Sequence, residues 1–102
     1  MPKQVFLATR NLVFRAKLAA VVAAAGAQVA PDDAACDTAV VDAESGGAAE
    51  RIRSWTARGV GVLAYGSHLQ ADLLRAARDA GAIAVPNSQV ERRLRELLTA
   101  KT

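Results

Sequence analysis

Cysteine and histidine are nearly absent from this chain of 102 residues, which has one of each, Cys36 and His68. A single cysteine cannot form an internal disulfide, and these two residues cannot supply the four ligands of a structural zinc site. The fold must therefore depend on its hydrophobic core, and a chain of this length can bury roughly 60–70% of its unfolded surface. A reducing, cytoplasmic setting fits this cysteine usage best.

Aromatic residues are also scarce, at 4% of the chain, and no apolar run approaches the roughly 18 residues of a membrane-spanning helix. So few aromatics argue against the base-stacking platforms of proteins that bind single strands. The net charge is only +3, and opposite charges are interspersed, as in ERRLRELL at residues 91–98, a pattern typical of a solvated helix face. We expect no nucleic-acid partner, no membrane partner and no signal peptide.

Hydrophobic residues, in contrast, make up 52% of the chain, and three glycines divide them into segments. Gly26, Gly59 and Gly81 each end a polar or alanine-rich run and precede an apolar one. Glycine accepts the left-handed conformation that closes a helix, and a short apolar run is typical of a buried strand. The sequence therefore predicts a helix, a stop and a strand at each glycine.

Apolar residues recur at helical spacing between these stops, which predicts four helices. The predicted stripes are Phe14, Leu18, Val21, Val22 and Ala25; Ala48, Ile52 and Trp55; Leu73, Ala77 and Ala80; and Val90, Leu94, Leu97 and Leu98. Asn11 is the expected cap of the first helix, and Ser88 with Glu91 has the spacing of a capping box before the last.

Short apolar segments between the helices predict five strands, at residues 5–8, 28–30, 38–41, 60–64 and 82–85. Strands that alternate with helices indicate a parallel sheet covered on both faces. We predict one domain, residues 1–102, with an α/β, flavodoxin-like, three-layer fold and a parallel sheet in the order 2-1-3-4-5.

The connection between the second and third predicted strands is unusually short, at residues 31–37. Seven residues reach at most about 23–25 Å. The crossover must span a diagonal of about 18 Å, so it can close only as an extended loop or a single helical turn. The second helix of the usual fold is therefore predicted to be shortened or absent.

Residues that follow the parallel strands converge on one edge of such a sheet, where ligands bind. They are Thr9, Arg10 and Asn11; Asp42 and Glu44; residues 65–68; and residues 86–88.

The order of strands, helices and glycines, with VVDAES at residues 40–45 and AYGSHLQADLLRAARDAGA at residues 64–82, resembles the receiver domain of bacterial response regulators over nearly the whole chain. In that family an aspartate after the third strand accepts a phosphoryl group, and an acidic pair after the first strand helps to bind magnesium. A Ser or Thr follows the fourth strand and a Lys the fifth. The resemblance implies that Asp42 is the phosphoacceptor equivalent.

The rest of the receiver pattern is missing, as in a pseudo-receiver. Thr9 and Arg10 replace the acidic pair, and Asn87 falls at the lysine position. Ser67 is a candidate for the Ser/Thr position, although Tyr65 or Gly66 aligns about as well.

These replacements have a physical consequence for Asp42. The guanidinium of Arg10 should repel magnesium, and it is well shaped to hold Asp42 in an ion pair. Two other interpretations of Asp42 stay open: a carboxylate bonded to nearby backbone, and a functional phosphoacceptor. Thr9, Arg10, Ser67 and Asn87 could also bind a small anion at this edge.

We therefore expect a non-catalytic signalling or scaffold domain that is not phosphorylated, has no enzyme activity, needs no cofactor or metal, and acts through protein contacts. The resemblance implies a contact surface at residues 69–80 and 88–98 for a partner or a homodimer. The lost helix could also leave apolar side chains of the first and third strands for a second subunit to cover. The alternative is a small-molecule or anion sensor that binds at the carboxyl-end edge of the sheet.

Overall fold

The structure is a computed structural model, and it describes residues 2–100. Strands and helices alternate along the chain, with one exception after the second strand. The elements are β1 (Gln4–Ala8), α1 (Leu12–Ala24), β2 (Gln28–Val29), β3 (Thr38–Asp42), α2 (Ala48–Ala57), β4 (Gly61–Gly66), α3 (Ala71–Asp79), β5 (Ile83–Pro86), the 3-10 helix η1 (Asn87–Gln89) and α4 (Val90–Thr99).

The strands form one parallel sheet in the order β2-β1-β3-β4-β5, which confirms the predicted fold class and topology. β3 lies at its centre, between β1 and β4. The last residue of β3, Asp42, is paired in register with Tyr65 of β4. This pairing places Asp42 at the carboxyl edge of the sheet, as expected from the sequence.

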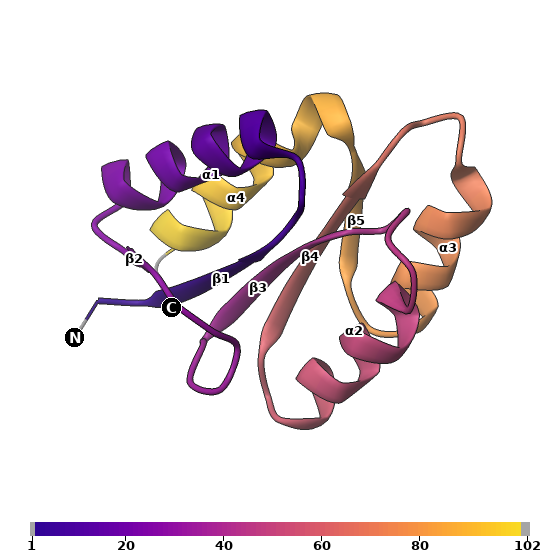
Figure 1. Ribbon diagram of the computed structural model, residues 1–102, viewed down its shortest axis with the longest axis horizontal. Coiled ribbons are helices and arrows are strands. Elements are labelled where there is room, and N and C mark those ends of the chain that lie inside the picture. The colour runs from indigo at the N-terminus through magenta and orange to yellow at the C-terminus, as the bar shows by residue number, and fades with distance from the viewer. Residues whose placement is uncertain (1, 101–102) are drawn as a thin grey trace.

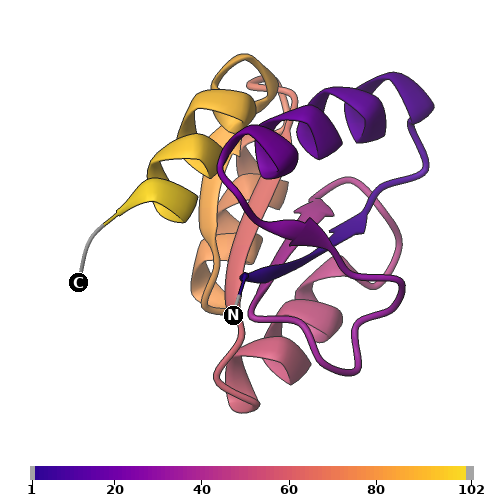
Figure 2. The ribbon, with the colours of Figure 1, turned by 90° about the vertical axis from the view of Figure 1, so that its left-hand side faces the viewer.

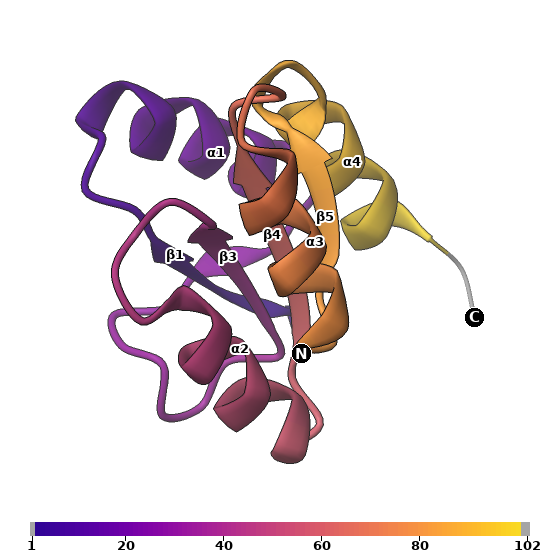
Figure 3. The same ribbon diagram turned by 90° about the vertical axis from the view of Figure 1, so that its right-hand side faces the viewer.

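Helices cover both faces of the sheet, so the molecule has three layers (Figure 1). α1 and α4 pack on one face, where Leu18, Val22 and Leu94 join side chains of the sheet in one apolar core. α2 and α3 cover the other face, as a second view makes clear (Figure 3). Trp55 of α2, only 1% exposed, is the largest fully buried side chain in that second core.

Local sequence signals act as predicted at several helix ends. The Asn11 side chain caps α1, because its Oδ1 accepts hydrogen bonds from the backbone N–H groups of Val13 and Phe14, at 3.0 and 3.1 Å. Gly81 follows α3 with φ of +113°, a conformation that side-chain-bearing residues rarely adopt.

Two local predictions are wrong. The buried stripe of α3 contains Leu74 and Ala77, whereas Leu73 is 38% exposed, because the adjacent leucine points about 100° away around a helix. Ser88 does not cap α4, because residues 87–89 form η1 and α4 begins only at Val90, where no side chain makes a capping bond.

The connection from β2 to β3, residues 30–37, contains no helix, which confirms the predicted loss of the second helix (Figure 2). Side chains of α2 and of the residue that caps its C-terminus, Arg58, hold this β2–β3 loop. The indole Nε1 of Trp55 donates to Asp33 Oδ2 at 3.1 Å, and Arg58 donates to the backbone carbonyls of Asp33 and Ala34. Cys36 is buried in the loop, and this burial raises the pKa of its thiol, although the nearby Arg58 partly opposes the shift.

The third strand does not offer the uncovered apolar surface that the short connection led us to expect. Ala39 and Val41 are fully buried in the core that α2 and α3 cover. The apolar residues of β1 on this side of the sheet, Phe6 and Ala8, are half-buried. The loss of a helix therefore exposes a small part of β1 alone.

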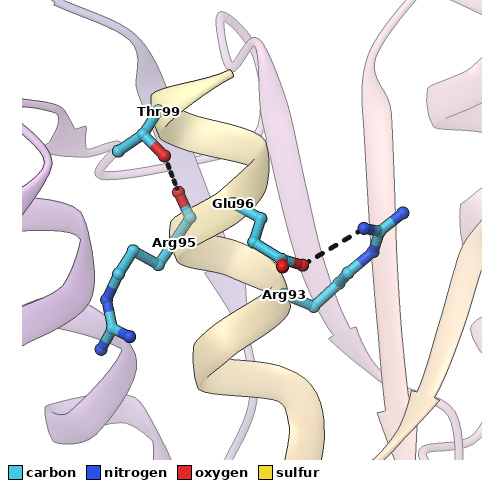
Figure 4. A network of polar contacts seen from close by, with 4 residues as sticks. All are labelled: Arg93, Arg95, Glu96 and Thr99. Atoms are coloured by element: carbon cyan, nitrogen blue, oxygen red, sulfur yellow. Dashed lines mark hydrogen bonds and ion pairs between the residues drawn. The ribbon is translucent and has the colours of Figure 1, made fainter.

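The outer face of α4 is polar, as the mixed charges of residues 91–98 predict (Figure 4). Arg93 forms an ion pair with Glu96 at 3.3 Å, and the Thr99 hydroxyl donates to the Arg95 carbonyl at 2.8 Å. Across residues 2–100, no helix combines the length and the hydropathy that crossing a bilayer requires.

Candidate functional site

Three side chains from neighbouring strands meet at the carboxyl edge of the sheet. The buried Tyr65 hydroxyl, from β4, donates a hydrogen bond to Thr9 Oγ1, just after β1. Burial raises the pKa of Tyr65, and the negative charge of Asp42 raises it further, against the opposing effect of the Thr9 hydrogen bond. The Tyr65 ring packs against Phe14 of α1, with ring centroids 5.0 Å apart. Thr9, Asp42 and Tyr65 therefore form the centre of the site.

Asp42 is held by the turn that follows it. Its Oδ1 accepts a hydrogen bond from the backbone N–H of Glu44 at 2.9 Å, and its backbone carbonyl accepts one from the Ser45 hydroxyl at 2.6 Å. Glu44 reaches in another direction, since its Oε2 accepts from the backbone N–H of Ser67 at 3.1 Å. The second carboxylate of this region is thus engaged with the loop after β4.

The predicted ion pair between Arg10 and Asp42 is not formed. Within residues 2–100, the ion pairs are Arg75 with Asp72 and Arg93 with Glu96. The alternative interpretation, a carboxylate bonded to nearby backbone, describes Asp42 in this structure. The bond from Asp42 to the Glu44 amide costs little conformational entropy, because the two residues are close in the chain. An ion pair would instead immobilise the long, exposed side chain of Arg10.

Arg10 and Asp42 nevertheless lie at the same hollow, which has a volume of about 700 Å³. Its lining residues come from β1 and the segment after it, the end of β3 and the turn after it, and α2: Phe6, Leu7, Ala8, Thr9, Arg10, Asp42, Ser45, Gly46 and Arg51. The hollow lies where the missing second helix leaves β1 incompletely covered. We call it the β1 hollow.

The other two candidate residues, Ser67 and Asn87, do not line the β1 hollow. Ser67 Oγ accepts a hydrogen bond from the backbone N–H of Leu69, and so shapes its own turn. Asn87 is the first residue of η1, at the end of the edge strand β5, two strands away from Asp42. The structure therefore brings together Thr9, Arg10 and Asp42 but separates them from Ser67 and Asn87.

Sequence reasoning missed two residues of this region, Tyr65 as the partner of Thr9 and Arg51 as a second cation at the hollow. A signal for Arg51 was present, because it precedes Trp55 by four residues and so lies over that ring on one face of α2. The Tyr65–Thr9 bond depends on the register of the sheet, which no local pattern encodes.

The donor set at this edge differs from a typical magnesium site, which is built from several oxygen ligands. Asp42 contributes one carboxylate to the lining of the hollow, which also includes the hydroxyl residues Thr9 and Ser45 and the cations Arg10 and Arg51. In the part of the chain that the structure describes, no three His, Cys, Asp or Glu side chains gather in a way that could hold a metal ion.

Comparison with known proteins identifies the fold. No family model and no curated protein matches the sequence. Among solved structures, the chain is similar to a response regulator from Thermotoga maritima, with a TM-score of 0.76 and 14% identity over 98% of this chain and 100% of that one. It is also similar to the ChxR receiver domain from Chlamydia trachomatis, with a TM-score of 0.65 and 15% identity over 97% and 94% of the two chains.

A response regulator protein from Burkholderia multivorans is similar as well, with a TM-score of 0.66 and 22% identity over 100% of this chain and 98% of that one. The sheet order and these three similarities agree. The chain has the flavodoxin-like fold of response-regulator receiver domains.

Proposed function

We propose that this chain is a cytoplasmic, receiver-like signalling domain that is not switched by phosphorylation and acts through protein contacts. The observation that carries the proposal is the environment of Asp42. Asp42 ends the central strand, where the resemblance to receivers implies the phosphoacceptor, and Thr9 and Arg10 follow the first strand, where it implies the acidic pair. This is the frame of a receiver with a different set of side chains at its edge.

Phosphoryl transfer to an aspartate needs a divalent cation to bridge and neutralise the phosphoryl oxygens. Magnesium binds through carboxylates and water, and one carboxylate at a hollow that is also lined by a guanidinium is a poor site for it. Arg10 contributes this repulsion without forming an ion pair with Asp42, because both residues line the same hollow. The Tyr65 hydroxyl, bonded to Thr9, adds a neutral group where a receiver would gather negative charge.

The proposed output is a contact surface at residues 69–80 and 88–98, through which a partner or a second copy of the chain would bind. Exposed apolar side chains support this choice. Leu69, just before α3, is 79% exposed, and Leu73, in the first turn of α3, is 38% exposed. Exposed apolar side chains of this size mark contact surfaces when they gather on one part of a molecule.

The first experiment tests phosphorylation. We expect no mass increase when the protein is incubated with acetyl phosphate and magnesium, and no magnesium-dependent change in the fluorescence of Trp55, the single tryptophan of the chain. The matched control is Asp42→Asn, which should give the same spectrum as the wild type. Stoichiometric addition of a phosphoryl group to the wild type, lost in Asp42→Asn, would refute the proposal.

The second experiment tests the contact surface. Sedimentation of the wild type should show self-association at high concentration, and Leu69→Ser with Leu73→Ser should abolish it, because these changes remove exposed apolar area. Leu12→Ser is the matched control, since Leu12 is 78% exposed on α1, outside the proposed surface. A wild type that stays monomeric, or an equal effect of the control, would contradict self-contact through this surface.

A second candidate function is a sensor of a small anion, and the β1 hollow favours it. The hollow joins the edge of the sheet, where flavodoxin-like folds bind their ligands, and two arginines line it.

A further inference from the structure

We propose that the β1 hollow binds an amphipathic monoanion, a flat apolar body that carries a single carboxylate or comparable acidic group. This inference rests on the second candidate function, the anion sensor, and names the ligand chemistry and the residues. It stands apart from the phosphorylation of Asp42 and from self-association, which are tested separately.

Two arginines supply positive charge to the hollow. Within residues 2–100, neither Arg10 nor Arg51 has a carboxylate at ion-pair distance or a hydrogen-bond acceptor for its guanidinium. Arg15, Arg58 and Arg78 differ, since each donates to a backbone carbonyl. The guanidinium groups at the hollow therefore keep all of their donors for an outside acceptor, and a carboxylate matches that donor geometry.

The position of Arg51 is restrained by the ring beneath it. Its guanidinium carbon lies 4.9 Å from the centroid of the Trp55 ring, a cation–π arrangement. Trp55 is itself fixed, because it is buried and its Nε1 donates to Asp33. A guanidinium held over a ring still has N–H groups for a ligand. Less side-chain freedom is lost when such a preplaced group binds an anion.

The floor of the hollow is apolar. It contains Phe6 and Ala8 of β1, both half-buried, whereas the Leu7 side chain lies in the core on the opposite face of the sheet. The Phe6 ring meets Trp55 edge to face, with centroids 6.2 Å apart, so its position is also fixed. The volume of about 700 Å³ lies within the range of roughly 300–1,000 Å³ that is usual for small-molecule sites.

Asp42 limits the charge that the ligand can carry. It is the one carboxylate among the residues lining the hollow, so the lining carries two positive charges and one negative charge. A polyanion such as a nucleoside triphosphate would bring several charges close to Asp42, and like charges in a partly enclosed site repel strongly. The ligand that best matches the charges and apolar residues of the lining therefore has a single acidic group near Arg10 and Arg51 and an apolar body on β1.

The test uses 2-naphthoate as the probe, with neutral 2-naphthamide and inorganic phosphate beside it. Trp55 fluorescence reports binding, because Phe6 and Arg51 of the hollow both contact its ring. Amide chemical shifts locate the site. We expect saturable naphthoate binding that shifts residues 6–10 and 42–46, at least tenfold weaker binding of naphthamide, and weaker binding of phosphate, which lacks the apolar body.

Variants separate the named arginines from general positive charge. Arg10→Gln and Arg51→Gln should each weaken naphthoate binding about tenfold, the effect of losing one charge-assisted hydrogen bond. The double variant should show no saturable binding. Arg53→Gln is the matched control, because Arg53 lies on the same helix but does not line the hollow, and it should bind as the wild type does.

Equal affinity for naphthoate and naphthamide would overturn the role of the arginines. Phosphate binding as tight as naphthoate would overturn the role of the apolar floor. Shifts outside the hollow, or an equal loss in Arg53→Gln, would overturn the site itself. None of these outcomes bears on whether Asp42 accepts a phosphoryl group, so this inference and the primary proposed function fail independently.

Discussion

Replacement of Tyr65 by Phe tests whether the hydroxyl at the edge of the sheet stabilises the fold. The change keeps the ring and its packing against Phe14, and it removes only the hydrogen bond to Thr9. A neutral intramolecular hydrogen bond contributes about 1 kcal/mol, so Tyr65→Phe should lower the free energy of unfolding at pH 7 by about that amount. For a domain of this size, the melting temperature should fall by about 4–8 °C.

The pH dependence gives a sharper test. Burial and the nearby Asp42 raise the pKa of Tyr65 in the folded state, so the folded protein holds its phenolic proton more tightly than the unfolded chain does. Stability from this group is complete below the ordinary pKa of about 10 and falls as the pH rises through the folded-state value. The advantage of the wild type over Tyr65→Phe should therefore shrink above about pH 10.

Urea unfolding of both proteins, followed by Trp55 fluorescence between neutral and alkaline pH, measures this difference. Cys36, whose thiol pKa is also raised, is present in both proteins, so its effect cancels in the comparison. The absorbance of tyrosinate reports the ionisation directly, since Tyr65 is the single tyrosine. A stability difference that grows with pH, or ionisation of folded Tyr65 at or below the ordinary pKa, would refute the reasoning.

Two further changes test the backbone and the β2–β3 loop. Gly81→Ala should lower the free energy of unfolding in urea by more than about 1 kcal/mol, because φ is +113° and the new Cβ would lie 2.9 Å from Thr56 Cγ2. The control is Gly46→Ala, whose new Cβ meets nothing within 4 Å and which should change the free energy of unfolding by less than about 0.5 kcal/mol. Equal effects of the two changes would contradict this. Asp33→Ala removes the hydrogen-bond acceptor of the Trp55 indole, so it should lower the free energy of unfolding by about 1.5 kcal/mol and shift the Trp55 emission to the red. Unchanged emission would show that this bond does not hold the loop.

The fold was predictable because several independent sequence signals agree. Gly26, Gly59 and Gly81 each have positive φ after a helix, so glycine ends these helices because the backbone there needs a left-handed conformation. The loss of the second helix followed from the reach of a short segment, which needs no knowledge of packing. The phase of α3 was wrong because Leu73 and Leu74 are adjacent, and only the packed structure decides which one is buried.

The site was predictable only in part. The order of the strands brings Thr9, Arg10 and Asp42 to one edge, and this could be inferred once the parallel sheet was assumed. Which atoms meet there could not be inferred. Asp42 could bond to a long cation or to the amide of Glu44, and the local bond forms because it orders less chain. Tyr65 enters the site through its register with β3, which is a tertiary property.

The β2–β3 loop has no core of its own, and this affects how the protein opens. Trp55 and Arg58, both contributed by the helical segment that follows β3, bind its backbone and side chains. Residues 33 and 34 are thus held by residues that come about twenty positions later in the chain, while the ends of the loop are bonded to β1. Fraying at the end of α2 would free the middle of the loop and remove Trp55 from Phe6 in the same event, so a motion at one helix end changes access to the sheet beside it.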